Sequence, residues 1–115
     1  MELIVSHFNH FDLIEISGRI DSYTAPEIDS TFSTLMTDSH YNIIVDLQNV
    51  SFISSSGILT FVKIQQKLKL DNKGEIIFMQ VPELVFKSFS IAGFDTVFTF
   101  YNDLETAMGG FGKML

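Results

Sequence analysis

Three consecutive serines followed by a glycine, Ser54-Ser55-Ser56-Gly57, carry the hydroxyl groups best placed for chemistry in this sequence. The apolar run Ile43–Val45 precedes them, and a helical pattern follows them to about Leu70. In an α/β domain, functional groups lie in the loops that join the carboxyl end of a parallel strand to the next helix. Unpaired N–H groups and the positive end of the helix dipole would surround such a hydroxyl. We therefore expect these serines to be accessible, and a change in their charge to alter the electrostatic potential around the loop.

The same residues have a simpler interpretation. Serine is a favoured N-cap, because its oxygen accepts a hydrogen bond from an unpaired N–H of the first helical turn. Capping alone would explain three serines before a helix, so both interpretations stay open at the level of the sequence.

Serine catalysis would need a general base close to the hydroxyl and a third group that orients the base. The sequence has three histidines, His7, His10 and His40, and nothing in their positions places them near Ser55. The Gly-x-Ser-x-Gly pattern of a nucleophile elbow is also absent. We therefore predict that the protein is not an enzyme.

Metal and cofactor sites also lack a sequence signal. His7 and His10 have a spacing that suits a helix, but they straddle an expected turn, where solvated side chains are the default. There is no cysteine, and neither a Walker nor a GxGxxG pattern occurs. The prediction is no metal site and no cofactor.

Composition limits the partners. The chain has 115 residues, which fits one domain, and 46% of them are hydrophobic. A net charge of −7 argues against binding to nucleic acid, which requires a basic surface. No apolar run reaches the length of about 18–20 residues that spans a bilayer, and no secretory signal is visible. We expect a cytoplasmic protein without direct membrane insertion.

Apolar periodicity and turn signals predict the elements. Two strands, 2–8 and 11–17, should form a hairpin around Asn9-His10, after which 18–21 should leave the sheet. The first helix should begin at Thr24, with Thr24 and Glu27 as a capping box. The remaining elements should be a short strand at 43–47, a helix at 56–70, a strand at 75–80, a helix at 82–92, a short strand around 97–98, and a terminal helix through about 108.

This order, ββαβαβαβα, predicts a single α/β domain with a mostly parallel or mixed sheet, a leading β-hairpin and about four helices. The domain should span residues 1–108, and glycines at 109, 110 and 112 indicate a flexible tail over 109–115. The helix at 82–92 is apolar on more than one face. It should therefore be deeply buried or have one side against a partner.

Two motifs stand out in this sequence. The first is Gly18-Arg19-Ile20-Asp21 followed by Thr24-Ala25, and the second is Ile44–Leu47, then Val50–Ile53, then Ser54–Gly57. The first is similar to the G-x-[LI]-D stretch, and the second to the strand and D-S-[SAT]-G loop, of the STAS domain of bacterial anti-sigma factor antagonists, which this chain resembles. The resemblance covers nearly the whole chain and implies a STAS-like fold.

Carried over by position, the family's phosphorylated serine falls on Ser55. Its loop aspartate falls on Ser54, where this sequence departs from the family's pattern. The sequence departs from that pattern again at Ile58-Leu59, where many members have Leu-Gly. Phosphorylation of Ser54 or Ser56 is the alternative.

The resemblance also implies the function. The unphosphorylated loop would bind an anti-sigma factor that is itself a serine kinase, and so release a sigma factor. Phosphorylation would add about −1.5 to −2 charges and repel the partner, and a metal-dependent serine phosphatase would reset the switch. The expected contact residues are Asp21, Ser54, Ser55, Ser56, Gly57, Leu59, Lys63 and Gln66. Two of them have a structural alternative: Leu59 could pack under the loop, and Asp21 could be a turn-forming residue.

STAS-like domains also serve as small subunits of lipid-transport ABC systems and in multi-protein stress-signalling assemblies. In that alternative the same surface would bind without a phosphorylation cycle. Partner identity separates the two: an ATPase subunit of a transporter in one case, a serine-kinase anti-sigma factor in the other.

Overall fold

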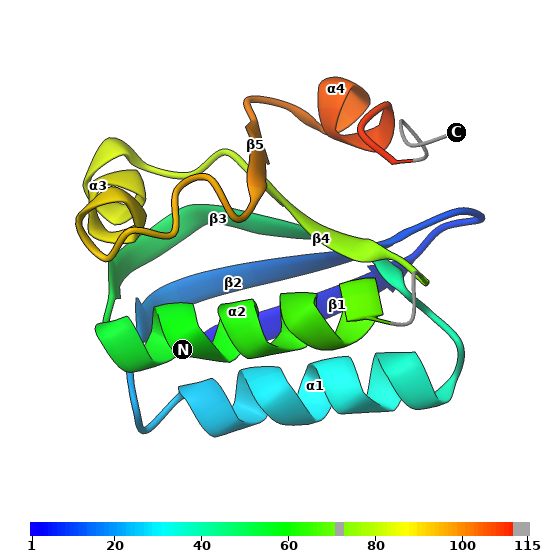
Figure 1. Ribbon diagram of the computed structural model, residues 1–115, viewed down its shortest axis with the longest axis horizontal. Helices are drawn as coiled ribbons and strands as arrows, with labels where there is room; N and C mark the ends of the chain where they lie inside the picture. The colour runs from blue at the N-terminus through cyan, green and yellow to red at the C-terminus, as the bar shows by residue number, and fades with distance from the viewer. Residues whose placement is uncertain (71–72, 112–115) are drawn as a thin grey trace.

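The computed structural model describes residues 1–70 and 73–111, which form a five-stranded sheet with helices packed around it (Figure 1). The sequence order ββαβαβαβα and the α/β class are confirmed. The elements are β1 (Glu2–His7), β2 (Asp12–Ile20), α1 (Ala25–Thr37), β3 (Asn42–Ile53), α2 (Ser55–Leu70), β4 (Glu75–Met79), α3 (Glu83–Ile91), β5 (Thr99–Tyr101) and α4 (Leu104–Met108).

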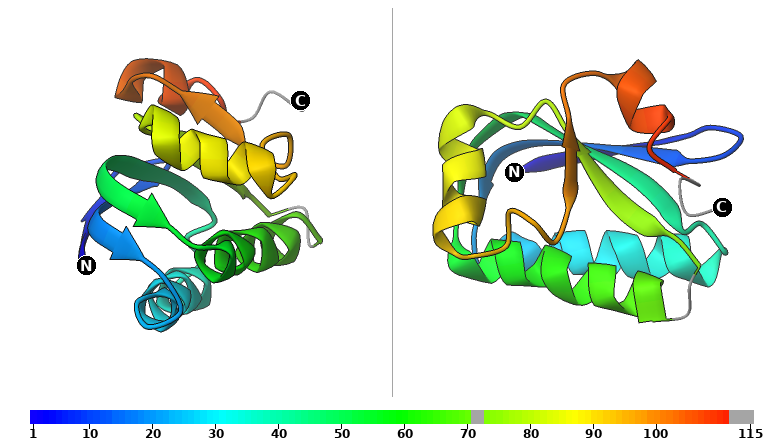
Figure 2. Two further views of the ribbon diagram at one scale, coloured as in Figure 1. Left: turned by 90° about the vertical axis from the view of Figure 1, so that its left-hand side faces the viewer. Right: turned by 45° about the horizontal axis from the view of Figure 1, so that its top comes forward.

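The sheet is mixed, with the strands in the spatial order β1-β2-β3-β4-β5. β1 pairs antiparallel with β2, and the other three pairings are parallel. Helices α1 and α2 run side by side along one face, and α4 lies on the other face (Figures 1 and 2). Helix α3 lies at the end of the sheet where β3 leads into α2 (Figure 1).

The first half of β3, residues 43–47, and residues 76–79 of β4 are buried on both faces, which explains the apolar runs in these two segments. Alternate residues belong to different clusters: Ile43 and Val45 to the larger one, and Ile44 to the smaller one under α4. The larger cluster fills the space between the sheet and helices α1, α2 and α3. It contains four fully buried phenylalanines, Phe32, Phe61, Phe78 and Phe89.

Strands β2 and β3 are longer than predicted. β2 continues through Gly18, which has φ +93°, to Ile20, and β3 continues to Ile53. The prediction that 18–21 leaves the sheet and that β3 ends at 47 was wrong. The polar residues Gln48 and Asn49 face solvent while Val50 remains buried, so a paired strand looked like a loop. Figure 2 shows how the extended ends curl toward α1 and α2.

The predicted capping box at the start of α1 was also wrong. Thr24 is the N-cap residue, but its side chain makes no cap hydrogen bond. Its hydroxyl donates instead to the carbonyl of Arg19, at 3.0 Å. The Asp21 carboxylate organises this turn by accepting hydrogen bonds from the N–H groups of Tyr23 (3.0 Å) and Thr24 (3.2 Å).

The carboxyl-terminal part of the structure differs in detail from the sequence prediction. The last strand lies at 99–101, not around 97–98, and Phe98 points into the larger cluster. Asp103 caps α4, and hydrogen bonds from the N–H and hydroxyl of Thr106 lower the pKa of this exposed carboxyl. Within the expected tail at 109–115, Gly110 is buried and Phe111 packs on Phe11. Residues 112–115 lie outside the described residues.

The two faces of α3 have different surroundings. Val85 and Phe89 are buried against the core, whereas Leu84 and Ile91 are 76% and 80% exposed. The helix is therefore not buried all round. Among the helices in the described part of the chain, none is long and apolar enough to cross a membrane.

Candidate functional site

The three serines occupy different structural positions at the start of α2. Ser54 follows β3, and its N–H donates to the carbonyl of Ile20, at 2.8 Å. The Ser54 hydroxyl accepts a hydrogen bond from the N–H of Gly57, at 3.1 Å. Ser54 therefore has the N-cap role, and it is half-buried against the end of β2.

Ser55 and Ser56 are both exposed in the first turn of α2. The hydroxyls of Ser54 and Ser56 lie 2.8 Å apart and share a hydrogen bond. The Ser55 hydroxyl makes no hydrogen bond with another described residue. Capping therefore accounts for Ser54, and a hydrogen bond to Ser54 accounts for Ser56, but neither gives the Ser55 hydroxyl a structural role.

Gly57 is required by the close approach of α2 to β2. A Cβ atom at this position would lie 2.7 Å from Cγ2 of Ile20 and 3.1 Å from Cγ1 of Ile53. Both isoleucines are buried and branched, so neither can move away easily. The absence of a side chain at Gly57 lets the helix start, and with it the serines, sit directly on the ends of the two strands.

Replacing Gly57 with alanine should destabilise the protein by about 1–2 kcal/mol, because overpacking outweighs the better helix propensity of alanine. The matched control is Gly109→Ala. The nearest atom to a Cβ there is 3.6 Å away and φ is −71°, so the free energy of unfolding should stay within about 0.5 kcal/mol. Urea denaturation of both variants measures this. Equal stability of the two variants would contradict the tight contact.

Asp21 lies beside the serine loop, because its neighbour Ile20 bonds to Ser54. Its carboxylate accepts from two N–H groups of the turn and is half-buried. The turn-forming interpretation of Asp21 is therefore supported by its geometry. Asp46, which ends the apolar run of β3, is likewise structural: it is 9% exposed and accepts from the N–H of Gln48 at 2.8 Å.

A shallow groove of about 430 Å³ lies between the first turns of α1 and α2. Ser56, Leu59 and Lys63 line it from α2, and Pro26 and Asp29 line it from α1. Leu59 is 42% exposed, although it is apolar, so it does not simply pack under the loop. Lys63 and Gln66 are exposed on the same helix.

Two of the three histidines contact the same carboxylate. His7 and His40 both contact the Asp12 carboxylate, with each Nδ1 at 2.6 Å from an oxygen. His7 is 61% exposed, but it lies at the end of β1 and contacts Asp12. Sequence reasoning missed the cluster because His40 is 28 residues from Asp12. These residues lie at the amino ends of β2 and β3, opposite to the serine loop.

Comparisons with known proteins agree on one family. The family model of the STAS domain matches residues 4–107. The anti-sigma-B factor antagonist of Staphylococcus aureus is 30% identical over 80 residues, which are 70% of this chain and 73% of that protein. The chain also resembles two solved structures of the anti-sigma factor antagonist SpoIIAA. The unphosphorylated form has a TM-score of 0.79 at 19% identity, covering 93% of each chain. The phosphorylated form, from Bacillus, has a TM-score of 0.73 at 18% identity, covering 94% of this chain and 97% of that one.

The chain therefore belongs to the STAS domain family. Its relatives carry the name of anti-sigma factor antagonists, which are binding proteins and not enzymes.

Proposed function

We propose that this protein is an anti-sigma factor antagonist whose partner binding is controlled by phosphorylation of Ser55. The unmodified protein binds a serine-kinase anti-sigma factor and thereby releases a sigma factor. The kinase phosphorylates Ser55, the complex dissociates, and a metal-dependent serine phosphatase restores the binding form.

The observation that carries the proposal is the state of the Ser55 hydroxyl. It is exposed, it makes no hydrogen bond with another described residue, and it lies in the first turn of a sixteen-residue helix. A kinase can therefore reach it without unfolding the loop. Ser54 and Ser56 are weaker acceptor candidates, because their hydroxyls bond to each other and Ser54 also caps the helix.

The replacement of the family's aspartate by Ser54 is compatible with this proposal. Aspartate and serine are both favoured N-cap residues, and the Ser54 oxygen makes the cap bond to Gly57. The serine therefore retains the shape of the loop and removes one negative charge. A phosphate on Ser55 would then lie near the positive end of the helix dipole without a neighbouring carboxylate in the loop.

The docking surface in this proposal extends from Asp21 and the loop, residues 54–57, along the exposed side of α2. Leu59 supplies apolar contact area, Lys63 supplies a polar contact in the groove, and Gln66 supplies one on the exposed side of α2. A dianionic phosphate at Ser55 would have to be desolvated against the partner. A penalty of about 1.4 kcal/mol weakens binding tenfold, so a modest repulsion is enough for a switch.

Reversal of the charge at Lys63 tests this surface. Lys63→Glu should weaken binding of the anti-sigma factor at least about tenfold, because it reverses a charge inside the proposed contact surface. The control is Lys69→Glu, which makes the same charge change on α2 at an exposed residue with only a 3.9 Å ion pair to Glu75. Surface plasmon resonance with both variants provides the measurement. Equal weakening would mean that net charge, and not this surface, governs binding.

The alternative function is that of a STAS subunit in a lipid-transport ABC system or a stress-signalling assembly, which binds without phosphorylation. Purification of the protein from its native host distinguishes the two. We expect peptide mapping to find a phosphoryl group on Ser55, and the co-purified partner to be a serine-kinase anti-sigma factor. A transporter ATPase as partner, with Ser55 unmodified, would favour the alternative.

A further inference from the structure

A second cluster of functional side chains lies at the opposite end of the sheet from Ser55. His7 ends β1, Asp12 begins β2, and His40 lies between α1 and β3. His7 and Asp12 are directly opposite each other in the antiparallel ladder. Pairing of β2 with β3 then brings the segment that contains His40 to the same place, since Asp12 is opposite Ile43. Three separate segments of the chain therefore converge on one carboxylate.

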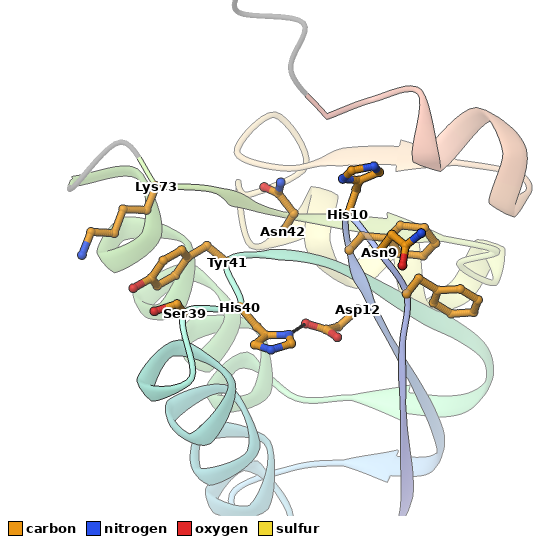
Figure 3. Close-up of a pocket in the computed structure, with 10 residues that line it drawn as sticks. Asn9, His10, Asp12, Ser39, His40, Tyr41, Asn42 and Lys73 are labelled. Atoms are coloured by element: carbon orange, nitrogen blue, oxygen red, sulfur yellow. Dashed lines mark hydrogen bonds and ion pairs between the residues drawn. The ribbon is translucent and has the colours of Figure 1, made fainter.

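Each oxygen of the Asp12 carboxylate contacts one imidazole. Oδ1 lies 2.6 Å from Nδ1 of His7, and Oδ2 lies 2.6 Å from Nδ1 of His40. The two rings meet edge to face with their centroids 5.3 Å apart. One ligand atom from each of the three residues can be chosen so that all lie within 4.8 Å of one another. Figure 3 shows the His40 ring turned toward Asp12, with His10 standing apart from this pair.

The Asp12 side chain is only 2% exposed, whereas those of His7 and His40 are 61% and 38% exposed. Burial of a carboxylate is costly unless its charge is compensated. Among the described residues, the two histidines are the only ones in ion-pair distance of Asp12, and no lysine or arginine joins them. The site is thus a buried anionic oxygen pair with two imidazoles that can reach solvent. Asp12 and His40 also line a pocket of about 390 Å³, which gives an ion a path to them.

We propose that His7, Asp12 and His40 form a binding site for Zn²⁺. Two imidazole nitrogens and a carboxylate are ligands that Zn²⁺ prefers, whereas Mg²⁺ and Ca²⁺ prefer oxygen ligands alone. A dication would also compensate the charge of the buried carboxylate. Three protein ligands leave the fourth coordination position open to the pocket, where water would complete a tetrahedral site.

The geometry needs only a small adjustment. Bonds of about 2.0–2.2 Å to a shared zinc ion would hold the nitrogen and oxygen atoms roughly 3.3 Å apart. Each Nδ1 would move away from its carboxylate oxygen by less than about 1 Å, and ligand atoms that now lie up to 4.8 Å apart would move closer together, which the exposed positions of the two imidazoles allow. Coordination through Nδ1 requires each imidazole to carry its ring hydrogen on Nε2, so a proton displaced from Nδ1 would pass to Nε2 or to solvent.

The test is a Zn²⁺ titration of the full chain after removal of bound metal with a chelator. Isothermal calorimetry gives the stoichiometry, and competition with a chromophoric chelator, measured by absorbance, gives the affinity. We expect one ion per chain and a rise of several degrees in Tm with added Zn²⁺. His7→Gln and His40→Gln should each weaken binding at least about tenfold, since loss of an outer-shell group alone costs that much. Both positions are partly exposed, so these variants should fold even if Asp12→Asn does not.

The matched control is His10→Gln, which removes the third histidine from the same hairpin and from the lining of the same pocket. It should leave the Zn²⁺ affinity unchanged. Side-chain ¹H–¹⁵N spectra should show coordination through Nδ1 of His7 and His40. The proposal is overturned if the wild-type chain shows no saturable binding, if His7→Gln and His40→Gln bind as wild type does, or if His10→Gln weakens binding as much as they do. Any of these results would leave a hydrogen-bonded cluster without a metal.

Discussion

Replacement of Ser55 by aspartate should weaken binding to the serine-kinase anti-sigma factor at least tenfold, which corresponds to about 1.4 kcal/mol. The substitution places a negative charge where the exposed hydroxyl now stands in the first turn of α2. That charge would have to give up its hydration when the partner covers the loop. Ser55→Ala should bind as the unmodified protein does, because the hydroxyl has no hydrogen bond to lose among the described residues. Calorimetric titration of both variants gives the two affinities.

A control for net charge is available in Asn102→Asp. Asn102 is exposed beside α4, on the opposite face of the sheet from α1 and α2. The substitution adds the same single charge to a chain already at −7 and should leave the affinity unchanged. If Ser55→Asp and Ser55→Ala bind equally well, the charge switch is not the mechanism of this protein.

The largest effect on stability is expected at Phe78, in β4. The side chain is fully buried, and its ring lies 4.9–5.2 Å from the rings of Phe98, Phe61 and Phe89. Phe78→Ala should lower the free energy of unfolding by about 3–5 kcal/mol, because it removes both transfer energy and packing contacts. Since typical domains are stable by only about 5–15 kcal/mol, this change should be plain in urea denaturation.

The control for Phe78 is Leu84→Ala on the exposed side of α3, where the leucine is 76% exposed. Its effect should stay within about 0.5 kcal/mol. A loss below about 1 kcal/mol for Phe78→Ala would mean that the aromatic cluster is not packed as described. A large loss for Leu84→Ala would mean that the exposed side of α3 is covered in solution.

The order of the elements was predictable because the signals for it are local. Continuous apolar runs marked β3 and β4, and Pro82 and Gly93 marked the ends of α3, where Gly93 has φ +84°. The full lengths of β2 and β3 were not predictable in the same way. Gln48 and Asn49 read as a loop, since their place in the sheet depends on pairing with β2 and not on their own sequence.

In the candidate site, too, the features with local signals were predictable and those that depend on tertiary contacts were not. Serines before a helix indicated the position of the loop, but only the hydrogen bonds distinguish the capping Ser54 from the unbonded Ser55. In the cluster at Asp12, only the pairing of His7 with Asp12 across the hairpin is local. The position of His40 depends on the register between β2 and β3, which brings together residues 28 positions apart. Contacts of this kind need the tertiary structure before they can be seen.

The most direct test of the switch compares one preparation in two covalent states. The chain is incubated with the anti-sigma factor kinase and ATP, and the phosphoserine is mapped. The modified and unmodified chains are then titrated separately against the same partner. Phosphate on Ser55 alone and a dissociation constant raised at least tenfold would agree with the mechanism proposed for this loop. An unmodified Ser55, or equal affinity of the two forms, would contradict it.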